Sequence, residues 1–295
     1  MLPQKTKTLI VDGTNLGVQA WFAHSVNQNG VPCSPTGQPI AGCHAVLKRL
    51  LQLIAHYEID ELAVVFDNGD TCFRHERYPN YKGGRGEKKD SMVKDVANLR
   101  RVFTLLGVAV VAPQGFEADD AIGTLATQAV AAGKSVFVCS GDWDLSQLVC
   151  DKCLLLYKRN SAVIEVREAD VKARFGVLPS LVADYKALAG DKSDGYPGVD
   201  KIGPKMALTL LNLYPGVEAL YANLHRIQGN PYTVLKAKGA KEAAFLFKSL
   251  ASLVLDVPLP AQDFRLAQMQ PMTARPFFKE LGLLNYLSQY ERLCA

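Results

Sequence analysis

The chain has 295 residues, of which 48% are hydrophobic and 21% charged, and its formal net charge is +4. This composition is typical of a globular protein and excludes a disordered or fibrous one, and the length allows one large domain or two modest ones. No apolar run is long enough to cross a bilayer, and the first residues contain no signal-peptide core. We therefore expect a cytoplasmic protein, without a membrane partner, whose seven cysteines are free thiols.

The N-terminal third of the chain predicts the start of a parallel sheet. Residues 8–12 form a short apolar run that predicts a buried strand, with Gly13 and Asn15 as turn residues after it. Apolar residues at helical spacing follow in 40–57, and 61–67 predict a second buried strand. A strand, a helix and a strand in this order indicate a βαβ unit.

The middle of the chain alternates an irregular segment with further helices and strands. Residues 68–90 lack periodicity and are rich in Gly, Tyr and basic side chains, which predicts a functional loop; with the helix predicted at 91–106 it would form an arch at about 70–105. A strand is predicted at 108–112. An acidic motif then opens a helix that ends near Gly133.

The strands end in the second half of the chain. Residues 135–140 predict another buried strand, and 154–157 and 163–166 predict a strand pair at the sheet edge. Helical patterns dominate from there on. We therefore expect an α/β domain at 1–175 and a helical domain at 176–295.

Acidic side chains follow the predicted strands and loops at one edge of this sheet. The carboxyl ends of parallel strands meet at the same edge, where open α/β sheets bind ligands. A single aspartate after a strand is usually a turn former. Nine acidic residues predicted at the same edge of the sheet instead indicate a site for hard cations such as Mg²⁺ or Mn²⁺. These nine residues are Asp12, Asp67, Glu117, Asp119, Asp120, Asp142, Asp144, Asp191 and Asp194.

A basic, aromatic stretch lies between Asp67 and the acidic motif that begins at Glu117. Residues 72–101 contain nine basic and four acidic side chains. Aromatic rings stack on bases and cations hold phosphates in proteins that bind single strands; a solvated basic loop is the alternative. If the predicted metal site cleaves phosphodiesters, Lys82 and Arg85 would hold the phosphate that is cut. The candidate DNA-binding residues are Phe73, Arg74, Tyr78, Tyr81, Lys82 and Arg85.

Residues 197–207 are similar to a helix-hairpin-helix turn. Backbone N–H groups at such a turn bind phosphates without reading bases, and Lys205 is placed to assist. An ordinary helix–helix turn with Gly and Pro is the alternative.

Five segments carry a family resemblance. In chain order they are LIVDGTN, VVFDNGDTCFRHERYPNYKGGR, GFEADDAIGTLA, SGDWDLSQLV and DYKALAGDKSDGYPGVDKIGPKMA. Together they resemble the 5′ nuclease family, which includes flap endonucleases and the 5′–3′ exonuclease domain of bacterial DNA polymerase I. The resemblance implies a PIN-like, mixed and mostly parallel sheet with flanking helices, a helical arch, and a helix-hairpin-helix element at about 190–213.

The resemblance also implies roles for individual residues. Two Mg²⁺ ions, for which Mn²⁺ substitutes, would be held by two groups of carboxylates. The first group would be Asp12, Asp67, Glu117 and Asp119, with Asp120 close by, and the second Asp142, Asp144, Asp191 and Asp194. Lys82 and Arg85 match the basic arch residues. The duplex-binding turn, where the family also holds K⁺, would contain Gly198, Ile202, Gly203 and Lys205.

Three positions depart from the family pattern. Gln19 stands where an arginine is usual, and Lys201 replaces the first glycine of the hairpin turn. If that position needs a positive φ, Lys201 carries a strain that puts the K⁺ site in question. The segment 86–89 replaces prolines that usually follow the arch arginine.

The resemblance implies a structure-specific 5′–3′ exonuclease and 5′ flap endonuclease that works by a two-metal mechanism. Its partners would be nicked or branched duplex DNA with 5′ flaps, RNA or DNA primer ends, and a DNA polymerase, and the protein would act as a monomer at the nucleoid in replication and repair. One alternative is a structure-specific DNA-binding protein with weak or no nuclease activity, which Gln19 and Lys201 motivate. A small RNase is a further alternative that does not account for residues 180–295.

Overall fold

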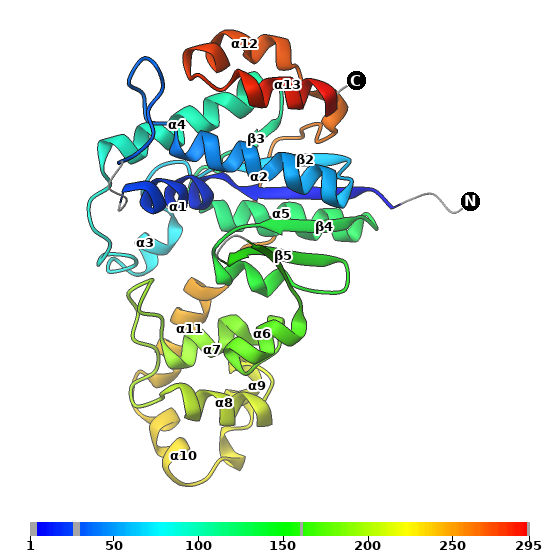
Figure 1. Cartoon of the computed structure of the whole chain (residues 1–295). Helices are drawn as coiled ribbons and strands as arrows, with labels where there is room; N and C mark the ends of the chain where they lie inside the picture. Colours follow the sequence, from blue (N-terminus) through cyan, green and yellow to red (C-terminus); the bar gives the residue numbers. More distant parts are fainter. Residues whose placement is uncertain (1–4, 26–29, 160–161, 294–295) are drawn as a thin grey trace.

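A six-stranded sheet forms the centre of the protein. The computed structural model describes residues 5–25, 30–159 and 162–293 (Figure 1). The strand order is β3-β2-β1-β4-β5-β6, and every neighbouring pair is parallel except β5 and β6. The strands are β1 (Lys7–Asp12), β2 (Glu61–Val65), β3 (Ala109–Val111), β4 (Ser135–Cys139), β5 (Cys153–Arg159) and β6 (Ala162–Val166). The predicted mixed, mostly parallel sheet and its antiparallel edge pair are confirmed.

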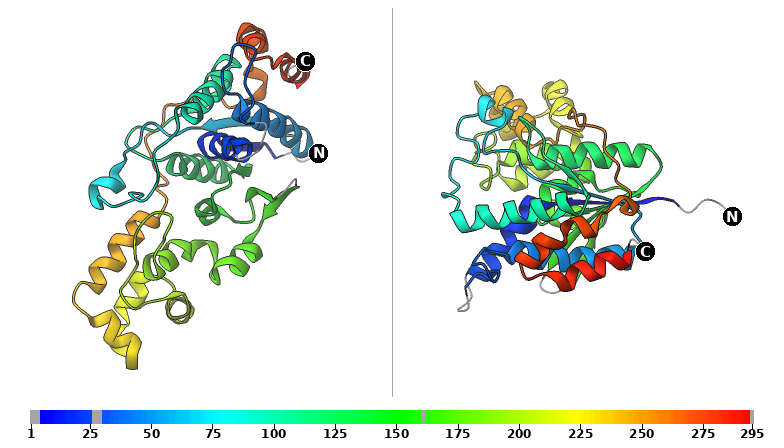
Figure 2. Two further views of the ribbon diagram at one scale, coloured as in Figure 1. Left: turned by 60° about the vertical axis from the view of Figure 1, so that its left-hand side comes forward. Right: turned by 90° about the horizontal axis from the view of Figure 1, so that it is seen from above.

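Side chains of β1 alternate between two hydrophobic cores on the two faces of the sheet. Leu9 and Val11 join the core under α1, α2, α4, α12 and α13, whereas Ile10 joins the core under α5. Figures 1 and 2 show these two helical layers on opposite faces. The bounds are α1 (Gly13–Ser25), α2 (Ala41–Tyr57), α3 (Phe73–Arg77), α4 (Asp90–Leu105), α5 (Ala118–Ala131), α12 (Pro271–Glu280) and α13 (Leu284–Leu293).

The prediction of a turn at Gly13 and Asn15 is wrong, because α1 begins directly after β1. Asp12 accepts a hydrogen bond from the Asn15 N–H at 3.0 Å through Oδ1, as a capping residue does. A Cβ added at Gly13 would lie 2.5 Å from the ring of Phe66. A glycine therefore allows the strand to pass into the helix without a loop.

The helical region extends the core under α5. It contains α6 (Glu168–Phe175), α7 (Val182–Ala189), α8 (Pro204–Leu213), α9 (Val217–Ala222), α10 (Gly229–Lys236) and α11 (Ala240–Ala251). Short 3-10 helices are η1 (Trp143–Leu148), η2 (Pro179–Leu181), η3 (Leu224–Arg226) and η4 (Leu266–Gln268).

The chain then returns to the sheet. The Leu62 N–H donates to the Phe264 carbonyl at 2.7 Å, and α12 and α13 pack against α4 and α2. The last two helices therefore contact the α/β region, although the sequence places them in the helical domain.

None of the described helices is both long and apolar enough to cross a lipid bilayer. The six cysteines among the described residues are free thiols, as expected.

Candidate metal centre

Three aspartates lie at the carboxyl ends of three neighbouring strands. Asp12 ends β1, Asp67 lies two residues beyond β2, and Asp142 lies three residues beyond β4. The strand order β2-β1-β4 places Asp12 between the other two. Their charges interact, since both Asp67 and Asp142 raise the pKa of Asp12.

Asp12 is held rigidly within this group. It is 3% exposed, and its Oδ2 accepts a hydrogen bond from the Ser140 hydroxyl at 2.7 Å. The Ser140 oxygen also accepts from the Asp142 N–H at 3.0 Å. Burial, the largest cause, raises the pKa of Asp12 to about 7 despite these hydrogen bonds. The sequence analysis did not identify Ser140, although it directly follows β4.

The start of α5 brings the carboxylates of Glu117 and Asp119 to this edge. The Ala118 N–H donates to Asp67 Oδ1 at 2.9 Å, which joins the first turn of α5 to the end of β2. Burial and then the charges of Asp142 and Asp12 raise the pKa of Asp119 well above its ordinary value. Carboxylates crowded in this way require either protons or a cation.

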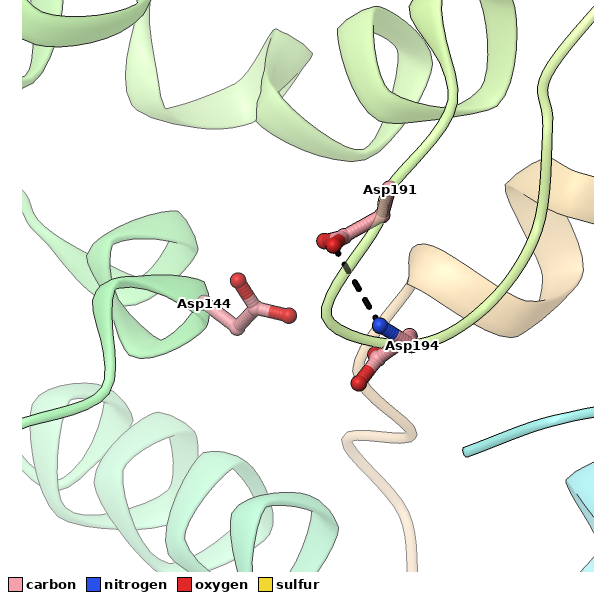
Figure 3. A group of neighbouring side chains, drawn as sticks. All are labelled: Asp144, Asp191 and Asp194. Carbon is pink, nitrogen blue, oxygen red and sulfur yellow. Dashed lines mark hydrogen bonds between the residues drawn. The ribbon is translucent and has the colours of Figure 1, made fainter. Parts of the chain in front are cut away.

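A second carboxylate group forms where η1 faces the loop after α7. Oxygens of Asp144, Asp191 and Asp194 all lie within 4.8 Å of one another. Figure 3 shows Asp144 extending from one element toward the two aspartates of the other. Asp191 Oδ1 accepts hydrogen bonds from the Ser193 N–H at 2.7 Å and the Asp194 N–H at 3.3 Å, which fixes the loop.

Lys186 lies against this second group and was missed by the sequence analysis. Its ammonium contacts Asp144 and lies 2.6 Å from Asp191 Oδ2. Burial would lower the pKa of Lys186, but the two carboxylates outweigh it and raise the pKa. A lysine in α7, five residues before Asp191, was the available signal.

Lys82 connects the arch to both carboxylate groups. Its ammonium contacts Glu117 and lies 4.0 Å from Asp194 Oδ1, and its N–H donates to the Asp194 carbonyl at 2.9 Å. Lys82 has φ 55°, in the left-handed region. Such strain is concentrated at functional sites, where surrounding contacts impose it.

The structure argues against a DNA-stacking role for Tyr81. The ring is 2% exposed, and its hydroxyl lies 2.9 Å from Glu117 Oε2 and 3.2 Å from Asp194 Oδ2. Tyr81 therefore orients two candidate ligands. Phe73 and Tyr78 remain half-buried, and the Tyr78 ring packs edge-on against Phe247.

The structure also argues against the roles predicted for Arg74 and Asp120. Both are buried, and the Arg74 guanidinium donates to the two Asp120 oxygens at 2.7 Å each. The Val254 N–H and the Glu117 N–H also donate to Asp120. With its oxygens occupied, Asp120 is a structural residue, and Arg74 has no exposed surface to offer a phosphate.

Arg85 and the hairpin turn are accessible. Arg85 is 57% exposed at its side chain and lies 3.2 Å from Asp194 Oδ1. In the hairpin turn, Gly203 precedes α8 as its N-cap, and Lys205 is exposed. Ile202 is buried.

Gly198 and Gly141 leave no space for a Cβ, and the exposed Gln19 covers Gly141. Gly198 has φ +76°, and a Cβ there would lie 2.3 Å from the Gly190 nitrogen. A Cβ added at Gly141 would lie 1.7 Å from Gln19 Nε2. Gln19 therefore lies at the rim of the carboxylate edge, beside the residue that precedes Asp142.

Family models match most of the chain. Residues 7–176 match the 5′-3′ exonuclease, N-terminal resolvase-like domain, and residues 177–273 match the 5′-3′ exonuclease, C-terminal SAM fold.

Two curated relatives differ in length. DNA polymerase I of Synechocystis is 33% identical over 293 residues, which are 96% of this chain and 30% of that protein. The 5′-3′ exonuclease of Buchnera aphidicola is 29% identical over 257 residues, which are 85% of this chain and 87% of that protein. The chain thus spans about a third of the length of the polymerases it matches.

Two solved structures share the fold. The T5 5′-exonuclease with bound divalent metal ions (zinc) has a TM-score of 0.70 at 20% identity, covering 95% of this chain and 99% of that one. The catalytic core of Rad2 in complex with DNA substrate has a TM-score of 0.58 at 13% identity, covering 97% and 91%.

Proposed function

The chain belongs to the 5′-3′ exonuclease family, and from this premise we propose that it is a structure-specific 5′–3′ exonuclease and 5′ flap endonuclease. The observation that carries the proposal is the pair of carboxylate groups at the sheet edge, beside the basic side chains of the arch. Burial and mutual repulsion raise the pKa values of Asp12 and Asp119 there. A nuclease that binds divalent cations accounts for keeping such groups together.

The donor set fits two Mg²⁺ ions. All its members are carboxylates, which hard cations prefer, and Mn²⁺ accepts the same donors. Asp12, Asp67, Glu117 and Asp119 would hold one ion, and the other would be held by Asp142, Asp144, Asp191 and Asp194. When bound, the two ions supply activation of a water molecule and stabilisation of the leaving oxygen.

The protein's own side chains orient these ligands and the phosphate. Ser140 and the Ala118 N–H fix Asp12 and Asp67, as supporting hydrogen bonds do around metal sites. The Lys82 ammonium, already between Glu117 and Asp194, is placed to hold the scissile phosphate, and the exposed Arg85 extends this positive charge outward. Hydrolysis would leave a 5′-phosphate and a 3′-hydroxyl.

Duplex DNA would bind at the hairpin turn. Gly198, Gly203 and Lys205 present backbone and an ammonium group to phosphates. Lys201 has φ 62°, so the turn keeps the backbone conformation that a glycine would adopt, which supports a K⁺ ion held by its carbonyls. Tighter duplex binding in K⁺ than in Na⁺ would support this ion, and equal binding would contradict it.

The substrates we propose are nicked and branched duplexes with a 5′ flap, including RNA primer ends. A monomer supplies all eight carboxylates of the proposed donor set. The polymerase relatives make a DNA polymerase the natural partner, and chromosomal DNA at the nucleoid the place of action in replication and repair.

Cleavage of a labelled 5′-flap duplex tests this function. We expect cutting near the flap junction in Mg²⁺, none in EDTA, and a loss of about a hundredfold or more in Asp142→Asn. Asp151→Asn, an exposed residue in the turn before β5, is the matched control and should cut normally.

Two outcomes would contradict the proposal. Tight flap binding without cutting in Mg²⁺ or Mn²⁺ would identify a DNA-binding protein instead. Faster cutting of RNA than of DNA flaps would identify a ribonuclease.

A further inference from the structure

The segment from the hairpin turn to the start of α11 carries a large share of the positive charge. Residues 201–241 contain six lysines and arginines and one acidic residue, a formal charge of +5, against +4 for the whole chain. The acidic residue, Glu218, is already paired with Lys248 at 2.6 Å. Asp200 and Glu242 flank the segment directly, so its excess positive charge lies between these two acidic residues.

Four of these basic side chains lie beyond the hairpin turn, and we name them the basic tip. Figure 1 and the left view of Figure 2 show η3, α10 and the start of α11 at the end of the molecule farthest from the sheet, beside α8. All four are exposed, and within the described part of the chain none forms an ion pair. They are Arg226, Lys236, Lys238 and Lys241.

This lack of ion-pair partners distinguishes the basic tip from the other basic side chains near the active edge. Lys82, Arg85 and Lys186 all contact carboxylates of the candidate metal centre. The tip instead has polar neighbours such as Asn230 and Thr233, both exposed. Lys236 lies over the Tyr232 ring at 5.3 Å and Lys241 over the Phe245 ring at 6.0 Å, contacts that leave their charges uncompensated. Exposed cations without ion-pair partners complement the phosphates of a nucleic acid.

We propose that the basic tip is a second duplex-binding surface, which holds the phosphate backbone of DNA beyond the hairpin turn. This inference rests on the proposed function, because it assigns the tip the same nucleic acid as the nuclease. The contacts are to phosphates, so they add affinity and salt dependence but no sequence preference. The tip lengthens the footprint along the duplex and leaves the chemistry at the carboxylates unchanged.

Duplex length separates this surface from the contacts near the cleavage site. Binding is measured by fluorescence anisotropy in Ca²⁺, on flap substrates whose duplex arms have roughly 10 or roughly 30 base pairs, one or three helical turns. The variant is Lys236→Gln with Lys238→Gln and Lys241→Gln. We expect its affinity for the long-armed substrate to fall about tenfold to a hundredfold at low salt, with a change of less than threefold for the short-armed one.

Salt dependence gives a second readout. Each lost phosphate contact lowers the slope of log affinity against log salt by about 0.9, so the slope on long arms should fall by about 2 to 3. The matched control removes the same charge from exposed lysines elsewhere, as Lys48→Gln with Lys152→Gln and Lys279→Gln. Thermal unfolding verifies that both variants fold.

Two results would overturn the proposal. Equal losses in the two triple variants would show an effect of net charge alone. Equal losses on short and long arms would place the lysines near the flap junction. Binding is measured separately from cleavage in Mg²⁺. If the protein binds through the tip but does not cut, the proposed nuclease function is contradicted and the proposed binding surface is supported.

Discussion

Lys201 adopts a left-handed backbone conformation, with φ 62°, in the turn ahead of α8. This conformation costs a residue with a Cβ about 1–2 kcal/mol, and glycine avoids the cost. Glycine also has more conformational entropy in the unfolded chain, which offsets about 0.4–1 kcal/mol of the stability gained by removing the strain. We expect Lys201→Gly to raise the free energy of unfolding by about 0.5–1 kcal/mol in urea titrations.

The neighbouring residue supplies the control for this substitution. Asp200 lies in the same turn without a positive φ, so Asp200→Gly should lower the free energy of unfolding by about 0.5–1 kcal/mol. Destabilisation by both substitutions would show that the Lys201 side chain stabilises the turn more than its backbone strains it.

The Arg74–Asp120 ion pair joins three elements. Arg74 lies on α3 and Asp120 on α5, and Arg74 also donates to the carbonyls of Leu250 and Ser252, at the end of α11 and just after it, at 2.8 Å each. Removing one partner leaves a buried charge uncompensated, so Arg74→Ala should cost about 3–5 kcal/mol in urea unfolding. Arg77→Ala, an exposed change on the same short helix, should cost little.

The same ion pair separates a structural aspartate from a candidate ligand. Asp120→Asn should lower the melting temperature in EDTA but keep the rise that Mg²⁺ produces. Asp119→Asn should reduce that rise. A loss of the Mg²⁺ effect in Asp120→Asn would restore the role that the sequence suggested for it.

Asp95 joins α4 to α2 and makes stability depend on pH. It is fully buried, and its Oδ2 accepts a hydrogen bond from the Gly42 N–H at 2.8 Å. Burial raises the pKa of Asp95 to about 6, against backbone hydrogen bonds that lower it. Because the folded pKa exceeds the unfolded one, the stabilising contribution is full below about pH 4 and is lost as the pH rises through 6.

Replacing Asp95 by asparagine should remove this dependence. The amide keeps an acceptor for Gly42 and carries no charge, so the part of the stability loss that Asp95 causes between pH 4 and 7, about 3 kcal/mol, should disappear. The parts that Asp12 and Asp119 cause should remain. Urea unfolding across this range measures it, with the exposed Asp256→Asn as control. An unchanged profile in Asp95→Asn would assign the pH dependence to other groups.

For the whole molecule, the features that could be predicted from the sequence are those that depend on residues close together in the chain. The strands at 61–65 and 135–139 contain the apolar runs 62–65 and 136–139, and the order of strands and helices indicates a parallel sheet. The carboxylate edge followed, because aspartates after strands share one edge. The start of α1 could not be predicted, since a strand that passes into a helix has no loop signal.

The partners of charged side chains were beyond sequence patterns. Arg74 and Arg85 both lie in one basic stretch, yet Arg74 is buried against Asp120 and Arg85 is exposed. Arg74 is buried because it contacts the segment at 250–254, which is more than 170 residues away in the chain. For the same reason, the return of α12 and α13 to the sheet has no local signal.

Lys186 lies where the two regions of the molecule meet, and its charge joins them. It contacts Asp144 from the α/β region and Asp191 from the helical region, so without it like charges face each other. Lys186→Met should therefore lower stability in EDTA by about 3 kcal/mol. A cation would then bind without competition from the ammonium, and a tenfold gain in affinity would increase the Mg²⁺-dependent stabilisation by about 1.4 kcal/mol.

Unfolding in urea with EDTA and with saturating Mg²⁺ measures both effects of Lys186→Met. Lys172→Met, on the exposed side of α6, should change neither. If Mg²⁺ stabilises Lys186→Met and the native chain equally, the lysine and the cation do not share these carboxylates. If Mg²⁺ stabilises the variant less, the lysine assists metal binding by holding Asp144 and Asp191 in place. An increase would mean that the two regions are held together by the ammonium in the absence of metal and by the cation in its presence.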